Sequence, residues 1–391
     1  MQVPPFSLSD QISLLGNDLE NAVLRVLRSG QYIGGPEVEA FEESFADILN
    51  VPYVVGCNSG TDALVLALRA LDIGKGDEVI TSAFSFFATA EAISEVEAKP
   101  VFVDVEIGSY LMDLDKVDHA ITTRTKAILP VHLFGCPIDM ERLNNIAKKN
   151  GLKVIEDCAQ AAGAKWDNLP VGSLGDIGCF SFFPTKNLGA AGDAGAVATK
   201  DPILAKRMRE LAIHGMPKRY IHSELGYNSR LDAIQAAVLN VKLVHMPNWI
   251  KKRQEVSEFY MHNLSGIEGI ELPSQPMSKN AFHSWNQFVI RVSQKYDDLN
   301  VNSSPKSYLR DQLKINLEEE GVNTIIYYPV PIHMQPAYKK LEFISQGLEV
   351  TERICNEVLS LPIFPEITYE QQKFVVDKLR EVLRKLNTIY L

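Results

Sequence analysis

The stretch Lys153-Val154-Ile155-Glu156-Asp157-Cys158-Ala159-Gln160 decides the fold class. Its short β-branched run is typical of a buried strand, and the polar residues that follow indicate where this strand ends. A helical pattern at 139–149 precedes the stretch, and a further strand pattern at 178–183 follows it. Strands that alternate with helices in this way indicate an α/β fold with a mostly parallel sheet and right-handed crossovers.

The alternation extends outward from this stretch over residues 51–200. Further strand patterns lie at 77–81, 100–104, 127–131 and 195–199, and a helical pattern lies at 87–96. The pattern then becomes mostly helical from 231 to 262, followed by a strand pattern at 287–292 and helical patterns at 305–320 and 369–386. We therefore predict a three-layer α/β sandwich over residues 1–246 and a smaller C-terminal α+β domain over residues 247–391. The segment 324–337 contains three prolines, so it is predicted to be an ordered loop.

The composition excludes several classes of protein. The chain has 391 residues and a formal net charge of -10, which disfavours binding to nucleic acid because a phosphate backbone requires a basic surface. The sequence has no apolar run of the length that spans a membrane and no secretory signal. The five cysteines are scattered without metal-binding spacing, so no metal site and no disulfide framework is predicted. We expect a cytoplasmic protein that has no membrane partner.

The segment Asn58-Ser59-Gly60-Thr61-Asp62 lies between an apolar run and a strong helical pattern. Serine or asparagine at a helix start can cap the free backbone N–H groups, and the same N–H groups can bind a phosphate. Gly60 would let an anion approach the backbone closely. Taken alone, the segment favours a plain helix cap.

Two other positions carry functional groups. Asp157 stands at the carboxyl end of a predicted buried strand, where ligands of open α/β sheets bind, although a helix cap or a loop salt bridge would look the same. Lys186 lies among aromatic and small residues in the segment Cys179 to Gly189. Desolvation would lower its pKa and free the amine for attack on a carbonyl, but a surface lysine on a turn is the alternative. Neither a GxGxxG nor a Walker-type motif is present.

Together these three segments have the order that pyridoxal 5′-phosphate requires. A lysine carries the aldehyde of this cofactor as a Schiff base, a carboxylate keeps the pyridine nitrogen protonated, and a helix start holds the phosphate. The set points to this cofactor more strongly than any one of the segments does.

The chain resembles the DegT/DnrJ family of nucleotide-sugar aminotransferases, which have the fold type I of aspartate aminotransferase. The similarity covers nearly the whole chain. Its motifs are Ser29 to Val38, Asn58 to Leu64, Glu156 to Gln160, Ser181 to Gly195, Gly226 to Ala237, and Tyr328 to His333.

The resemblance implies a role for each matching residue. Lys186 matches the catalytic Schiff-base lysine that also moves protons. The other implied cofactor contacts are Ser59, Gly60 and Thr61 with Ser181 at the phosphate, Phe86 stacked on the ring, Asp157 at the pyridine nitrogen, Gln160 near the 3′ oxygen, and Asn228 reaching the phosphate from a neighbouring subunit. The implied substrate contacts are Tyr32, Tyr220 and His333. Core packing for Phe86, a turn for Asn228 and an ordinary partly exposed histidine at His333 remain the alternatives.

The family resemblance implies a homodimer with shared active sites. It implies that glutamate gives its nitrogen to the cofactor, that pyridoxamine 5′-phosphate is the intermediate, and that this form aminates a dTDP- or UDP-linked keto-sugar. The segment Pro184 to Gly189 is more similar to the branch that aminates C3 than to the C4 branch. Lys218 and Arg219 could meet the diphosphate, or could belong to a solvated loop.

Two other functions stay open at this stage. A sugar 3-dehydratase of the same family would have histidine in place of Lys186. A non-catalytic ligand-binding or regulatory protein on the same fold would bind the cofactor without turnover. Products of the aminotransferase reaction would feed amino sugar and surface polysaccharide biosynthesis.

Overall fold

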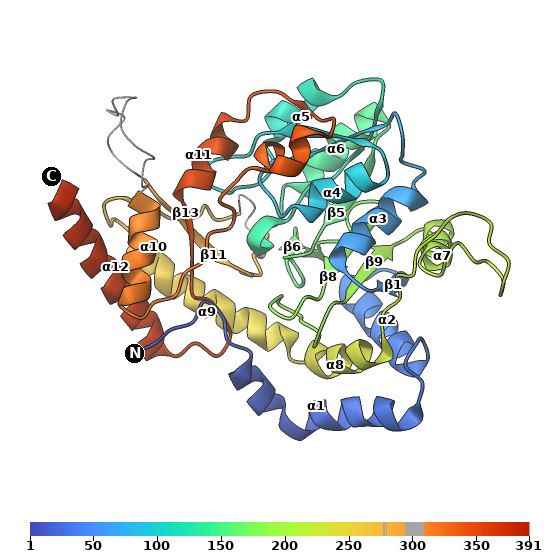
Figure 1. The fold of residues 1–391 in the computed structure, drawn as a ribbon, viewed down its shortest axis with the longest axis horizontal. Coiled ribbons are helices and arrows are strands. Elements are labelled where there is room, and N and C mark those ends of the chain that lie inside the picture. Colours follow the sequence, from blue (N-terminus) through green and yellow to red (C-terminus); the bar gives the residue numbers. More distant parts are fainter. Residues whose placement is uncertain (277, 279, 294–308, 391) are drawn as a thin grey trace.

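The computed structural model describes residues 1–390 except 277, 279 and 294–308. An eight-stranded sheet lies at its centre, in the order β1-β9-β8-β5-β4-β2-β3-β12 (Figure 1). The strands are β1 (Tyr53–Cys57), β2 (Glu78–Ser82), β3 (Lys99–Val103), β4 (Thr125–Ile128), β5 (Lys153–Asp157), β8 (Ile177–Ser181), β9 (Gly195–Thr199) and β12 (Ile344–Ser345). Strand β9 is antiparallel to both neighbours, and every other pair in this sheet is parallel. The predicted mostly parallel α/β sheet is confirmed.

Helices cover both faces of this sheet because successive strand residues point to opposite sides. Val55, Val79 and Ile155 pack against α3, α4 and α7 on one face. Val54 packs towards α1, α2 and α8 on the other face, and Val154 packs towards α5 and α6 there. These helices are α1 (Ser9–Ser29), α2 (Pro36–Leu49), α3 (Gly60–Ala70), α4 (Ala88–Glu95), α5 (Leu114–Ala120), α6 (Met140–Asn150), α7 (Pro202–Leu211) and α8 (Ala233–Leu243). The arrangement is the predicted three-layer sandwich.

A second core lies around a smaller antiparallel sheet in the order β10-β11-β13. Helix α9 runs from the end of α8 to this sheet, where α10 and α12 also pack (Figure 1). The elements of this region are α9 (Met246–Leu264), β10 (Ile270–Glu271), β11 (Phe288–Val292), α10 (Leu309–Glu319), α11 (Glu349–Glu357), β13 (Val358–Leu361) and α12 (Tyr369–Tyr390). Residues 305–308, where the predicted helix 305–320 begins, lie outside the described residues. The predicted boundary between residues 246 and 247 stays a prediction.

Two segments of the chain cross between these two regions. Val3 forms a bridge with Val322, so the start of the chain packs into the second core. Strand β12, from the C-terminal third, pairs with β3 and extends the large sheet. The segment 324–337 is irregular apart from short 3₁₀ turns, η2 (Ile332–Met334) and the beginning of η3 (Pro336–Lys339), as its prolines predict.

Within the described part of the chain, no helix has both the length and the apolar character needed to cross a bilayer. The five cysteines are free and buried.

Candidate active site

A cavity of about 610 Å³ opens at the carboxyl end of the large sheet. Strands β1, β2, β5 and β8 end at this edge, and the antiparallel β9 begins there. The cavity therefore collects the segments that follow several strands, as the geometry of parallel sheets requires. Its wall contains eight of the predicted residues: Ser59, Gly60, Thr61, Phe86, Asp157, Gln160, Ser181 and Lys186.

The start of α3 forms one end of the cavity. Ser59 caps this helix, because its Oγ accepts the N–H of Asp62 at 3.1 Å. The first N–H groups of a helix have no partner within the helix, and they favour a negative charge. Gly60 packs so closely against β8 that a Cβ atom there would lie 2.6 Å from Cβ of Ser181. Glycine is therefore required, and it places the helix start and the Ser181 hydroxyl beside the same space, where an anion can bind.

Asp157 lies at the end of β5 and is buried. Thr89 donates to its Oδ2 at 2.9 Å, and the N–H of Ala159 donates to its Oδ1 at 3.1 Å. Burial nevertheless raises the pKa of Asp157, against these two hydrogen bonds and the nearby Lys186 charge. A carboxylate whose pKa is raised by burial is stabilised in its charged form by a cationic partner that donates a further hydrogen bond.

Lys186 lines the cavity on the loop after β8, which we call the lysine loop (residues 182–190). Its side chain is partly buried, and this desolvation lowers the pKa of Lys186 to about 8, while the Asp157 charge acts in the opposite direction. More of the amine is then unprotonated near neutral pH than in an ordinary lysine. An unprotonated amine is the nucleophile that attacks an aldehyde.

Gln160 and Tyr328 are joined across the cavity. Gln160 accepts the N–H of Phe134 at 2.7 Å, and its Nε2 donates to the Tyr328 hydroxyl at 2.8 Å. The second amide hydrogen of Gln160 is left for a ligand. Tyr328 comes from the proline-rich segment and is separated from Gln160 by 168 residues.

The comparisons with known proteins agree with this geometry. Residues 14–380 match the DegT/DnrJ/EryC1/StrS aminotransferase family. The chain belongs to this family.

Its relatives include a UDP-N-acetyl-3-dehydro-α-D-glucosamine 3-aminotransferase from Acidithiobacillus ferrooxidans, which is 42% identical over 97% of this chain and 98% of the relative. A pleiotropic regulatory protein from Geobacillus stearothermophilus is also 42% identical, over 98% of this chain and 99% of its own. A crystal structure of DesV from S. venezuelae in complex with a ketimine intermediate has a TM-score of 0.90 and 40% identity, and covers 97% of this chain and 98% of that chain.

Aminotransferases of this family depend on pyridoxal 5′-phosphate, and the cavity fits that cofactor. The helix start beside Ser181 would hold the phosphate, and Asp157 would hold the protonated pyridine nitrogen. A protonated ring nitrogen is the cationic partner that this buried carboxylate favours. Bound there, the cofactor supplies an electron sink for bonds broken at the amino acid's α carbon.

The sequence reasoning missed two polar residues of the site. Thr89, which donates to Asp157, lies one helical turn after Ser85, and the two hydroxyls are 2.8 Å apart. Two hydroxyl residues at this spacing, on either side of Phe86, are a sequence signal for a polar contact at the site. Tyr328 begins a motif of the family resemblance, but its contact with Gln160 had no signal, because only the folded chain brings the proline-rich segment to Gln160.

Four predicted residues of the family site lie outside this cavity in the single chain. Asn228 and Tyr220 are exposed on the segment that follows α7. The Tyr32 hydroxyl donates to the carbonyl of Leu27. His333 contacts Glu352 at 3.2 Å and lies beside Phe102. Their predicted roles stay predictions.

Phe86 lines the cavity and is 58% exposed. Its ring centroid lies 6.3 Å from that of Tyr328. A large apolar ring held open to a cavity is suited to stacking on a flat ligand. Core packing, the alternative for this residue, does not fit its exposure.

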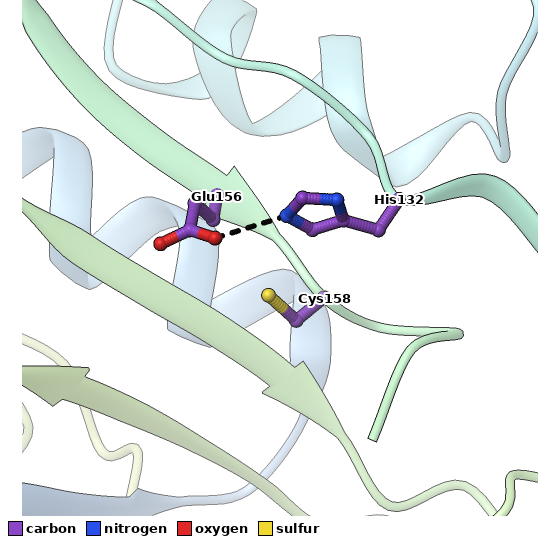
Figure 2. A group of neighbouring side chains, drawn as sticks. All are labelled: His132, Glu156 and Cys158. Atoms are coloured by element: carbon purple, nitrogen blue, oxygen red, sulfur yellow. Dashed lines mark hydrogen bonds and ion pairs between the residues drawn. The ribbon is translucent and has the colours of Figure 1, made fainter. Parts of the chain in front are cut away.

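A buried cluster of His132, Glu156 and Cys158 lies near the end of β5 (Figure 2). Their donor atoms lie within 4.8 Å of one another, as in a metal site. Hydrogen bonds already use the ring nitrogens of His132 and the carboxylate oxygens of Glu156, however. Glu156 accepts the N–H groups of Gly172, Leu174 and Gly175 together with Nε2–H of His132, and Nδ1 of His132 accepts the N–H of Ile138. These contacts indicate that His132 and Glu156 stabilise the backbone at Ile138 and at residues 172–175.

Proposed function

We propose that this chain transfers an amino group from glutamate to C3 of a keto-sugar linked to UDP or dTDP. One observation carries the proposal: the Lys186 amine and the Asp157 carboxylate line one cavity together with the capped start of α3. The printed name of the A. ferrooxidans relative, a 3-aminotransferase of a UDP-sugar, supports position C3.

Each side chain would have a separate task. Lys186, with its pKa lowered to about 8, would take a proton from one carbon and return it to another, which needs a group that titrates near neutral pH. Asp157 would keep the pyridine nitrogen protonated. Phe86 and Gln160 would fix the plane of the ring, and the wall formed by Ile326, Tyr327 and Tyr328 would limit where the sugar lies.

The proposal includes a homodimer whose active sites are shared. Within the described lining of the cavity, Lys186 is the one cationic side chain, yet a nucleotide diphosphate carries negative charge that requires cations or N–H donors. Lys218 and Arg219 lie on the exposed segment that carries Asn228. A second copy that presents this segment to the cavity would supply both the diphosphate contacts and the predicted contact of Asn228 with the cofactor phosphate.

The visible spectrum with pyridoxal 5′-phosphate is the first test. The wild-type chain should show a Schiff-base absorption band, and glutamate should convert it to the pyridoxamine form. Lys186→Ala should lack the band, and Lys148→Ala, an exposed lysine at the end of α6, should retain it. A band that is indifferent to Lys186 would overturn the assignment.

The sugar half-reaction requires a second test. The pyridoxamine form should be consumed by a UDP- or dTDP-linked 3-keto-sugar and should persist with the 4-keto isomer. NMR of the amino sugar then identifies the carbon that carries nitrogen. Consumption by the 4-keto isomer alone would contradict amination at C3.

Mixed dimers test the sharing of sites. Lys186→Ala and Asn228→Ala should each be nearly inactive alone. Unfolding and refolding them together should restore about a quarter of wild-type activity, because half of the dimers would carry one intact site. No recovery from refolded mixed dimers would contradict the contribution of Asn228 across the interface.

The printed name of the G. stearothermophilus relative favours a second candidate, a regulatory protein that binds the same ligands. That function predicts a Schiff-base band that glutamate leaves unchanged. The dehydratase alternative predicts loss of water from the sugar without amine transfer, and the presence of Lys186 rather than histidine counts against it.

A further inference from the structure

The lysine loop is held from two sides by buried polar side chains that do not line the cavity. On one side, Nζ of Lys242 donates to the carbonyl of Gly189 at 2.8 Å. On the other side, Nδ2 of Asn187 donates to the carbonyl of Ser284 at 2.9 Å. Both side chains are at most 5% exposed. Lys186 is next in sequence to Asn187 and three residues before Gly189.

Lys242 is an unusual residue for its place. It lies on α8 among apolar residues that pack against the large sheet. Lysine is seldom buried, because removing its charge from water costs free energy that a methionine or leucine would not. Among the described residues, Lys242 has no carboxylate within ion-pair distance, and Gly189 is its one hydrogen-bond acceptor. Its one hydrogen bond is made to the lysine loop, while the Glu366 charge acts on it from beyond ion-pair distance.

The loop also has backbone hydrogen bonds of its own. The N–H of Ala190 donates to the carbonyl of Phe182, and that of Lys186 donates to the carbonyl of Phe183, so the loop is closed at its base. At Gly189 the backbone lies so close to Pro184 that a Cβ atom would be 2.3 Å from its carbonyl oxygen. A glycine held at that distance has no side chain to anchor it, and its carbonyl is the group that Lys242 holds.

The second contact connects the loop to the other core. Ser284 leads into β11, and the next two carbonyls, of Trp285 and Asn286, accept from Nη1 of Arg253 on α9. Lys242 and Arg253 are eleven residues apart, close to three helical turns, on helices that follow one another (Figure 1). Helix α8 therefore places Lys242 at the lysine loop, and α9 places Arg253 at the segment that this loop contacts.

We propose that Lys242 and Asn187 are positioning residues that hold the Lys186 amine in place for reaction with the cofactor aldehyde. The inference rests on the proposed role of Lys186. A displacement of about 1 Å at a reacting group can reduce a rate by about 100-fold, so small movements of this loop matter. Burial lowers the pKa of Lys242 to about 8, and the side chain donates to Gly189 in either protonation state.

The test follows Schiff-base formation after apo-protein is mixed with pyridoxal 5′-phosphate. The readouts are the rate at which the absorption band appears and the mass of the Lys186 peptide after borohydride reduction. Lys242→Met should slow formation by about 10- to 100-fold, and Asn187→Ala should slow it by a smaller factor. Because both residues hold one loop, the double variant should deviate from the product of the two single effects.

Tyr260→Phe is the matched control. It removes one buried hydrogen bond, from the Tyr260 hydroxyl to the carbonyl of Pro362, in the second core and away from the lysine loop. Its melting temperature should fall because this hydrogen bond is lost, but the band should appear at the wild-type rate.

Folded Lys242→Met and Asn187→Ala that form the band at the wild-type rate would overturn the inference while leaving the proposed function intact. If Lys242→Met fails to fold, Asn187→Ala decides by the same measurement. A wild-type chain without a band would overturn the proposed function and this inference together. A slowing in Tyr260→Phe equal to that in Lys242→Met would reduce the effect to general stability and would also overturn it.

Discussion

Strand β5 ends in two adjacent buried carboxylates that face different surroundings. Glu156 accepts three backbone N–H groups and His132, so its oxygens are fully used by the protein (Figure 2). Asp157 receives Thr89 and one N–H group, and burial still raises its pKa. A carboxylate saturated by the chain stabilises loops, whereas one left short of partners is ready for a cationic ligand.

The largest expected effect is on the activity of Asp157→Asn. The amide cannot keep a pyridine nitrogen protonated, so amine transfer should fall by about 100- to 1,000-fold, the usual loss for one electrostatic contact at a reacting group. The melting temperature should hold or rise, because an uncharged side chain replaces a desolvated one. Steady-state kinetics and thermal melts check both values. Full activity would remove the distinction between the two carboxylates.

Glu156→Gln should show the opposite pattern. Its amide nitrogen would face N–H groups that now donate to a carboxylate, which leaves buried donors unsatisfied at about 1–3 kcal/mol each. We expect the free energy of unfolding to fall by about 3 kcal/mol, measured in urea. Activity per folded molecule should change much less than in Asp157→Asn. A stable Glu156→Gln that had lost its activity would place Glu156 in the chemistry.

His132→Leu should have a smaller effect of the same kind. It removes one donor to Glu156 at 3.0 Å and one acceptor of the Ile138 N–H at 3.2 Å. A loss of about 1–2 kcal/mol is expected by urea unfolding. Addition of zinc should not change wild-type stability, since hydrogen bonds already use the His132 and Glu156 ligand atoms. Stabilisation by zinc that His132→Leu abolishes would contradict this interpretation.

The smallest effect is in the pH dependence of apo-protein stability. Because the pKa of Asp157 is raised on folding, the unfolded state releases this proton at a lower pH than the folded state does. Asp157 therefore lowers stability as pH rises from about 3.9, its unfolded value, through the folded value. The difference in unfolding free energy between wild type and Asp157→Asn should grow in that direction. A constant difference would contradict the raised pKa.

The sequence predicts the sheet and the order of its motifs from local patterns, and local patterns together with the family resemblance predict eight residues of the cavity wall. Val154 and Ile155 signal a buried strand by themselves, and Asp157 follows from the end of that strand. Tyr328 and Lys242 could not be found this way, since their contacts join segments that are distant in sequence. The role of Glu156 in stabilising loops could not be predicted either, because the N–H groups that donate to it come from a loop 16–19 residues later.

The bridge between Val3 and Val322 has a consequence for synthesis of the chain. During translation, the first residues leave the ribosome more than 300 residues before the segment that they pair with. Strand β3 likewise has no partner on its outer edge until β12, at residues 344–345, has been synthesised. Contacts over such separations form slowly. The nascent chain therefore carries its first segment unpaired until most of the chain exists, and chaperones have their longest access to the protein there.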